Sequence, residues 1–171
     1  MEPVTATLTK PTIAALALLL AACATDAPRS ARAPAERPRN VLADIRNEAA
    51  NYRADFQIEL IRDAAIIDAI EASKQAEMRG DRVAAEAALR NALDDPEAKQ
   101  RYAELLLARG KAAEAERLAR EAYEASAKLG EWCARSWLTV AEARLLQNAP
   151  NGAAQARARV PECKAPQVDR Y

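Results

Sequence analysis

Apolar residues recur every three or four positions along most of this chain, which is the spacing of amphipathic α-helices. Residues 41–79 contain neither Gly nor Pro, and their pattern changes phase near Arg62-Asp63, so they predict one long kinked helix or two helices. The helices from residue 64 onward are expected over residues 64–79, 82–94, 96–109, 112–129, 131–148 and 153–160. Because the loops between these helices are very short, neighbouring helices should pack antiparallel.

Glycine, proline and aspartate mark the expected helix ends. Gly80 and Gly110 each follow an arginine at the end of an apolar-periodic segment, as C-terminal cap glycines do. Asp95-Pro96 predicts a helix start, with Asp95 as the N-cap and Pro96 in the first turn. Gly130 is expected to end a helix, and Pro150-Asn151-Gly152 is expected to form a turn.

The composition favours an all-α protein. Half of the residues are hydrophobic, only 4% are aromatic and there are four glycines, while alanine, leucine, glutamate and arginine are abundant. The formal net charge is zero, which gives no sign of nucleic-acid binding. Histidine is absent, which excludes His-based catalytic triads and metal sites. We therefore expect no enzyme activity, no cofactor, no metal and no small-molecule substrate.

The N-terminal region contains an apolar stretch, Ile13 to Ala22, preceded by the basic Lys10. Its roughly ten residues are half of the ~20 that cross a bilayer, as expected for the core of a signal peptide. The stretch ends in Leu20-Ala21-Ala22-Cys23, which resembles the lipobox of bacterial lipoproteins. The resemblance implies removal of residues 1–22 and lipidation of Cys23. Ordinary secretory cleavage or an uncleaved buried helix are the alternatives.

The residues after Cys23 indicate a tether followed by one domain. Ala24, rather than Asp, follows the cysteine, and in enteric lipoproteins this resembles the default that directs the protein to the outer membrane, where it faces the periplasm. Residues 23–40 contain three prolines and no apolar periodicity, which predicts a disordered spacer. The helical domain is expected over residues 41–163, followed by a flexible tail over residues 164–171.

Two segments of the domain are similar to one another. Ala85 and Ala92 follow Gly80 at the same offsets at which Ala115 and Ala122 follow Gly110. This pattern resembles the tetratricopeptide repeat (TPR), a helix-turn-helix unit of roughly 34 residues. The resemblance spans about residues 64–160 and implies a stack of about three antiparallel hairpins, although the two glycines stand closer together than in the family. Residues 41–62 would form an N-terminal cap. An unrelated small helical bundle remains the alternative.

The resemblance also implies a function. TPR proteins bind peptides or partner helices in a groove lined by the first helix of each hairpin. The matching groove positions are Ile70, Lys74, Glu77, Glu97, Gln100, Glu104 and Leu107. Their mixed charges suggest a partner segment of both signs, so the chain is expected to be a lipid-anchored adaptor for an envelope protein. A structural lipoprotein that contacts peptidoglycan and a glycan-cleaving cell-wall enzyme are the alternatives.

Cys133 and Cys163 are the other two cysteines, and an exported chain meets an oxidising compartment. From Cys133 to the turn at Pro150 the helix covers roughly 25 Å at ~1.5 Å per residue, and the return path to Cys163 is of similar length. An antiparallel hairpin therefore brings the two cysteines together, which predicts a disulfide; two buried thiols are the alternative. Trp137 is expected between helices, and Trp132 over the disulfide, exposed, or stacked on a ligand.

Overall fold

The computed structural model describes residues 39–53 and 61–165. Within these residues it contains seven α-helices and three 3-10 helices, and no strand. The α-helices are α1 (Val41–Ala49), α2 (Ala64–Met78), α3 (Arg82–Leu89), α4 (Pro96–Ala108), α5 (Ala112–Ala125), α6 (Gly130–Leu146) and α7 (Pro150–Ala158). The 3-10 helices are η1 (Ala50–Tyr52), η2 (Arg90–Ala92) and η3 (Val160–Cys163). The expected all-α class is therefore confirmed for the described part of the chain.

Several expectations concern residues that the structure does not describe. The signal peptide over residues 1–22, the lipidated Cys23 and the spacer up to residue 38 lie outside the described residues. The same holds for residues 166–171 of the expected tail. These remain predictions from the sequence.

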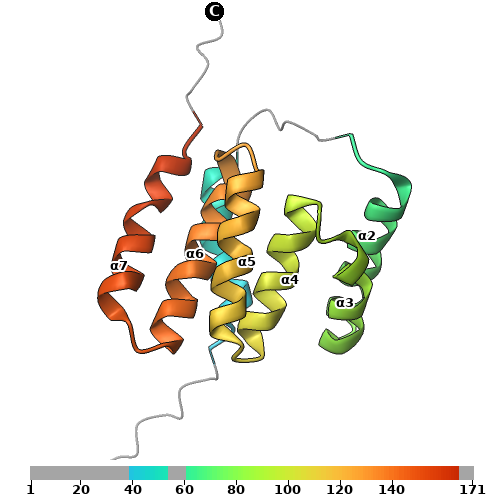
Figure 1. The fold of residues 1–171 in the computed structure, drawn as a ribbon, viewed down its shortest axis with the longest axis horizontal. Coiled ribbons are helices and arrows are strands. Elements are labelled where there is room, and N and C mark those ends of the chain that lie inside the picture. The colour runs from blue at the N-terminus through green and yellow to red at the C-terminus, as the bar shows by residue number, and fades with distance from the viewer. Residues whose placement is uncertain (1–38, 54–60, 166–171) are drawn as a thin grey trace, which may run out of the picture. The chain divides into compact units, whose positions relative to one another are not determined.

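Helices α2 to α7 are arranged as consecutive antiparallel hairpins. The pairs α2/α3, α4/α5 and α6/α7 each pack together, and α3 and α5 also contact the helix that follows them (Figure 1). Fully buried alanines occupy many of the contacts between these helices, and such small side chains let two helix axes approach closely. They include Ala85, Ala98, Ala103, Ala115, Ala119, Ala134 and Ala141.

The first helix of each hairpin ends in the same hydrogen-bonded motif. At the end of α2, Gly80 N–H donates to Glu77 O (2.9 Å) and Asp81 N–H donates to Ala76 O (2.9 Å). This is the Schellman motif, which requires a positive φ at its central residue. Gly80 and Gly110 both have φ of 77°, and Lys111 N–H donates to Leu106 O (3.0 Å) at the end of α4. The two expected cap glycines therefore have the predicted role.

The third motif is centred on Asn148, which the sequence analysis did not identify. Asn148 N–H donates to Leu145 O (3.0 Å), Ala149 N–H donates to Arg144 O (2.9 Å), and Asn148 has φ of 57°. The expected turn at Pro150-Asn151-Gly152 is wrong, because Pro150 is already the first residue of α7. Gly130 likewise begins α6 instead of ending α5, and its φ is 74°.

Helix α1 is separate from α2, which decides between the two alternatives for residues 41–79. Arg53, directly after η1, has an extended backbone, and α2 begins at Ala64. The expected position of this N-terminal helix as a cap of the stack is wrong, because α1 packs against α6 and α4. In Figure 1 it is the cyan helix seen largely behind α6.

Candidate functional site

Glu104 of α4 lies at the centre of the domain and is fully buried. Arg135 of α6 donates to both of its carboxylate oxygens, Nε to Oε1 at 2.7 Å and Nη2 to Oε2 at 2.6 Å. Arg46 of α1 donates from Nε to Oε2 at 2.8 Å. Burial on its own would raise the pKa of Glu104, but the charge and hydrogen bonds of Arg135, with the charge of Arg46, lower it to about 2. Glu104 is therefore a stable carboxylate that joins three helices.

A chain of neutral side chains continues this contact between α4 and α6. Gln100 donates from Nε2 to Glu104 Oε1 (3.1 Å) and to Thr139 Oγ1 (2.9 Å), and it accepts a hydrogen bond from the Ser136 hydroxyl at 3.1 Å. All four side chains are buried. Buried polar groups stabilise a structure only when they are paired in this way, so the network fixes the register of α6 on α4.

Arg46 also connects α1 to α2. Its Nη1 lies 2.7 Å from Glu77 Oε2, so one guanidinium bridges carboxylates from two different hairpins. Burial disfavours the charged form of Arg46, but Glu104 and Glu77 together raise its pKa above the ordinary value. The side chain stays ionised at any pH at which the domain is folded.

Three arginines spaced seven residues apart form ion pairs between α1 with its flanks and the helices α2, α4 and α6. Arg39 donates to Glu142 of α6 (Nη1 to Oε2, 3.0 Å), and Arg53 donates to Glu131 of α6 (Nη2 to Oε2, 2.9 Å). Arg46 stands midway between them. We call Arg39, Arg46 and Arg53 the arginine row. Since Arg39 meets the later and Arg53 the earlier glutamate, α1 runs antiparallel to α6.

Apolar residues between the arginines hold α1 to the stack. Leu42, Ile45 and Ala49 are buried, and Tyr52 is partly buried. Ile45 and Ala49 belong to the same core cluster as Leu107 of α4, while Leu42 belongs to the cluster of Ile70. Burying a leucine or isoleucine side chain contributes about 1.5–3 kcal/mol, so these residues supply most of the docking energy.

We call the surface covered by α1 the α1-docking face. It is defined by the residues of α2, α4, α6 and α7 that pair or pack with α1 and its flanks: Ile70, Glu77, Glu104, Leu107, Glu131, Glu142 and Arg157. Arg157 of α7 closes its edge, because it pairs with Glu48 of α1 (3.1 Å) and with Glu142 (3.0 Å).

The structure brings together most of the residues expected to line a groove. Ile70, Gln100, Glu104 and Leu107 are buried, and Glu77 is bound by Arg46. The other two contact different partners. Glu97 pairs with Arg62 (3.2 Å) and Arg101 (2.9 Å), and Lys74 lies 3.7 Å from Glu71 of its own helix.

The occupant of this surface was not expected from the sequence. Residues 41–62 were expected to form a cap, and no role was expected for Arg46, or for Arg135, Glu131 and Glu142 of α6. The signal that could have revealed the contact is the regular spacing of Arg39, Arg46 and Arg53, in register with the apolar positions of α1.

The fit of α1 is incomplete on its α2 side. Arg46 Nη2 and Glu77 Oε1 are buried and have no hydrogen-bond partner in the described part of the chain, although the two side chains are paired through their other atoms. An unsatisfied buried polar atom costs about 1–3 kcal/mol. On the opposite side, Arg46 pairs with Glu104 of α4, and Arg39 and Arg53 pair with Glu142 and Glu131 of α6. Helix α1 therefore complements α6 better than α2.

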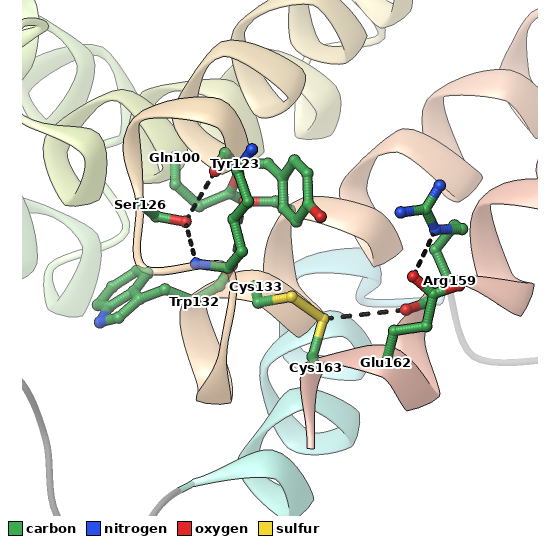
Figure 2. Close-up of a disulfide and its surroundings, with 10 residues drawn as sticks. Gln100, Tyr123, Ser126, Trp132, Cys133, Arg159, Glu162 and Cys163 are labelled. Carbon is green, nitrogen blue, oxygen red and sulfur yellow. Dashed lines mark hydrogen bonds and ion pairs between the residues drawn. A yellow bond between two sulfur atoms is a disulfide. The ribbon is translucent and has the colours of Figure 1, made fainter. Parts of the chain in front are cut away.

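A disulfide between Cys133 and Cys163 joins the start of α6 to η3, with a Cα–Cα distance of 5.5 Å (Figure 2). It is the pair for which the hairpin geometry predicts a bond. Cys163 follows α7, so the covalent link holds the last hairpin closed at its open end. Both cysteines are fully buried beside the apolar residues of α6.

The two tryptophans of α6 have different surroundings. The Trp132 ring lies between two guanidinium groups, with its centroid 4.2 Å from Arg135 and 5.2 Å from Arg101. It points away from the disulfide in Figure 2, so its expected position over that bond is wrong. Burial, followed by the charge of Arg135, lowers the pKa of Arg101. Trp137 packs on Tyr123 of α5, with ring centroids 4.9 Å apart, as expected for a residue between helices.

The described residues contain neither a metal site nor a membrane-spanning helix. Residues 39–53 and 61–165 hold no cluster of histidine, cysteine or carboxylate side chains arranged to bind a metal ion. No helix in these two ranges has the length and apolarity needed to span a bilayer. Comparisons of the chain with known protein families, with curated proteins and with solved structures find no match.

Proposed function

We propose that this protein is a lipid-anchored adaptor on the periplasmic side of the bacterial outer membrane. In this proposal a TPR-like stack of helical hairpins presents a binding surface to an envelope protein, and acyl chains on Cys23 hold the stack at the membrane. Several acyl chains bind a bilayer far more firmly than one, whose grip is marginal. The protein's role would be to hold a partner, without chemistry of its own.

The TPR-like character is supported by the repetition of one local motif. Each of α2, α4 and α6 ends in a Schellman cap, and the helix that follows packs back on it. Repeats of this kind bury their apolar faces only by stacking on neighbours, which agrees with the buried alanines between successive helices.

The observation that carries the adaptor function is the position of α1. The first helices of the hairpins, which line the peptide groove in the TPR family, together hold an amphipathic helix through Glu77, Glu104 and Leu107. A surface that binds one helix through shape and charge can bind another of the same chemistry. Nothing comparable supports a peptidoglycan contact or a catalytic site.

Site-directed photocrosslinking in the native host tests this function. A photoreactive residue at Lys74, beside the α1-docking face, should capture one or two envelope proteins. The matched control places the same residue at Arg117 on α5, which is more than half exposed. Equal capture from both positions, or none from either, would count against the adaptor.

The anchor has its own test. The mass of the intact protein extracted from native membranes should correspond to a chain that begins at Cys23 and carries acyl groups. A Cys23→Ser variant should accumulate with residues 1–22 attached. A free thiol at Cys23, or a mature protein that begins elsewhere, would contradict the lipoprotein assignment.

A further inference from the structure

We propose that α1 is a replaceable occupant of the α1-docking face, and that the face binds a partner helix with arginines seven residues apart and apolar residues between them. This inference rests on the proposed adaptor function and names the chemistry of its partner. Three features support it: the charge of the face, the weakness with which α1 is held, and the incomplete contact with α2.

The charge of the face specifies a basic helix. Its carboxylates are Glu77, Glu104, Glu131 and Glu142, whereas its one cation is Arg157, and Arg135 behind it pairs with Glu104. With α1 removed, the face would keep an excess of negative charge, and Glu77 and Glu131 would lose the arginines that now bind them. A helix that restores these pairs must carry cations at the spacing of the arginine row. Arginine fits better than lysine, because Arg46 bridges two carboxylates with one planar group.

The contacts of α1 include few that hold it firmly. The helix has only 9 residues, and a helix of this length is not stable without tertiary contacts. Arg39 and Arg53 have side chains 57% and 60% exposed, so solvent screens their pairs with Glu142 and Glu131, although these two glutamates are only 6% and 17% exposed. The anchoring therefore depends on Leu42, Ile45 and Ala49, and on the single buried arginine.

The unpaired atoms on the α2 side identify where a partner could bind better. Glu77 Oε1 is buried and has no partner in the described residues, although Arg46 binds the other oxygen of the same carboxylate. Arg46 Nη2 is also buried and without a partner there. A helix with a hydrogen-bond donor opposite α2 would satisfy contacts that α1 leaves unmade.

A peptide with the sequence of residues 39–53 serves as the probe, labelled with a fluorophore and titrated into the full-length processed protein. The wild type should bind it weakly, because its own α1 competes. The variant Ile45→Ala, which weakens α1 without touching the docking face, should bind it at least tenfold more tightly. A probe with Arg46→Glu should lose at least tenfold in affinity for that variant.

The matched control is Ile67→Ala on α2, where the isoleucine is half exposed. This variant should bind the probe as the wild type does. If Ile45→Ala binds no more tightly than Ile67→Ala, or if the Arg46→Glu probe binds as well as the original, the proposal is overturned. Dimers that exchange α1 between two copies would also overturn it, because the occupant would then be a second copy of this chain.

Hydrogen exchange on the wild type keeps the proposal testable if Ile45→Ala does not fold. The amides of Ile45–Ala49 should exchange at least a hundredfold faster than those of Ala103–Leu107, because α1 would detach and unfold while the other helices stay folded. Exchange of both segments at the same slow rate would overturn the proposal. These measurements need neither the lipid nor the envelope partner. A negative result here would therefore leave the adaptor function intact, and an absence of crosslinks would leave the displacement of α1 intact.

Discussion

Arg46 and Glu104 stand 58 residues apart in the sequence, and Nε of the arginine lies 2.8 Å from Oε2 of the glutamate. Because Arg135 binds the same carboxylate, helices α1, α4 and α6 converge on one fully buried side chain. The Glu104 carboxylate keeps all of these hydrogen bonds only while both arginines are in place. The pair therefore couples the position of α1 to the packing of the stack.

Removing the charge of Glu104 should destabilise the protein strongly. In Glu104→Gln two arginines lose a shared buried carboxylate, and breaking a buried ion pair costs about 3–5 kcal/mol. Urea unfolding followed by circular dichroism measures the change. The matched control is Glu124→Gln, at an exposed glutamate paired with Lys128, which should change the free energy of unfolding by at most about 0.5 kcal/mol. Equal effects of the two substitutions would mean that the buried network contributes nothing.

The stability should also depend on pH through Glu104. Its pKa of about 2 in the folded protein lies below the ordinary value of 4.5, so the unfolded chain takes up the proton first as the pH falls. The contribution is complete above about pH 5 and is lost between about pH 4.5 and pH 2. Glu104→Gln lacks it, so the difference in unfolding free energy between wild type and variant should shrink over this range. A constant difference from pH 7 to pH 2 would refute the assignment.

Reduction of the disulfide should loosen the last hairpin. The bond spans a sequence separation of 30 residues, for which the chain-entropy model gives about 3–4 kcal/mol. Addition of a reductant should lower the free energy of unfolding of the wild type by that amount and shift its urea midpoint to a lower concentration. The double variant Cys133→Ser/Cys163→Ser should already have the lower midpoint and should not respond to reductant. A wild-type midpoint that is insensitive to reductant would contradict this prediction.

The caps of the first helices should differ in their response to substitution. Gly110 has φ of 77°, and a Cβ there would meet no atom within 4 Å, so Gly110→Ala should lose about 1 kcal/mol through backbone strain alone. Asn148 occupies the equivalent position with φ of 57°, and Asn148→Gly should be neutral or slightly stabilising. Thermal unfolding of the two variants measures both effects. A stabilising Gly110→Ala would show that the cap is not in the left-handed conformation.

The sequence predicted helix ends where the cap chemistry is explicit. Asp95 accepts hydrogen bonds from Glu97 N–H and Ala98 N–H, and Gly80 and Gly110 provide the positive φ that ends α2 and α4. Asn148 was missed because the nearby Pro150-Asn151-Gly152 is a stronger turn signal in sequence. Proline, however, is equally favourable as the first residue of a helix, and the local pattern does not distinguish the two roles.

The end of α5 shows another limit of local patterns. Residues 112–129 were expected to be helical, but α5 ends at Ala125, where Ser126 is extended and its hydroxyl donates to Tyr123 O at 2.9 Å. Serine competes for backbone hydrogen bonds in this way, whereas the apolar spacing continues through Leu129 without a break. The Ser126 hydroxyl also accepts from Lys128 N–H, and Lys128 has φ of 56°.

The position of α1 could not be derived from its own sequence. The apolar spacing of α1 shows which of its faces is buried. Which helices cover that face depends on contacts between residues up to 109 apart, such as Glu48 with Arg157. The residue types of the docking face were recognisable, since Glu77, Glu104 and Leu107 were expected to line a surface. Their burial under a segment of the same chain required the three-dimensional structure.

Arg39 stands two residues before the start of α1, and this arrangement has a mechanical consequence. A pulling force transmitted along the preceding residues reaches Arg39 and α1 before it reaches any hairpin. Such a force would peel α1 from α6 one ion pair at a time, beginning with Glu142, while the disulfide keeps α6 and α7 joined. Tension on the N-terminal segment would thereby expose the docking face and leave the remaining helices folded.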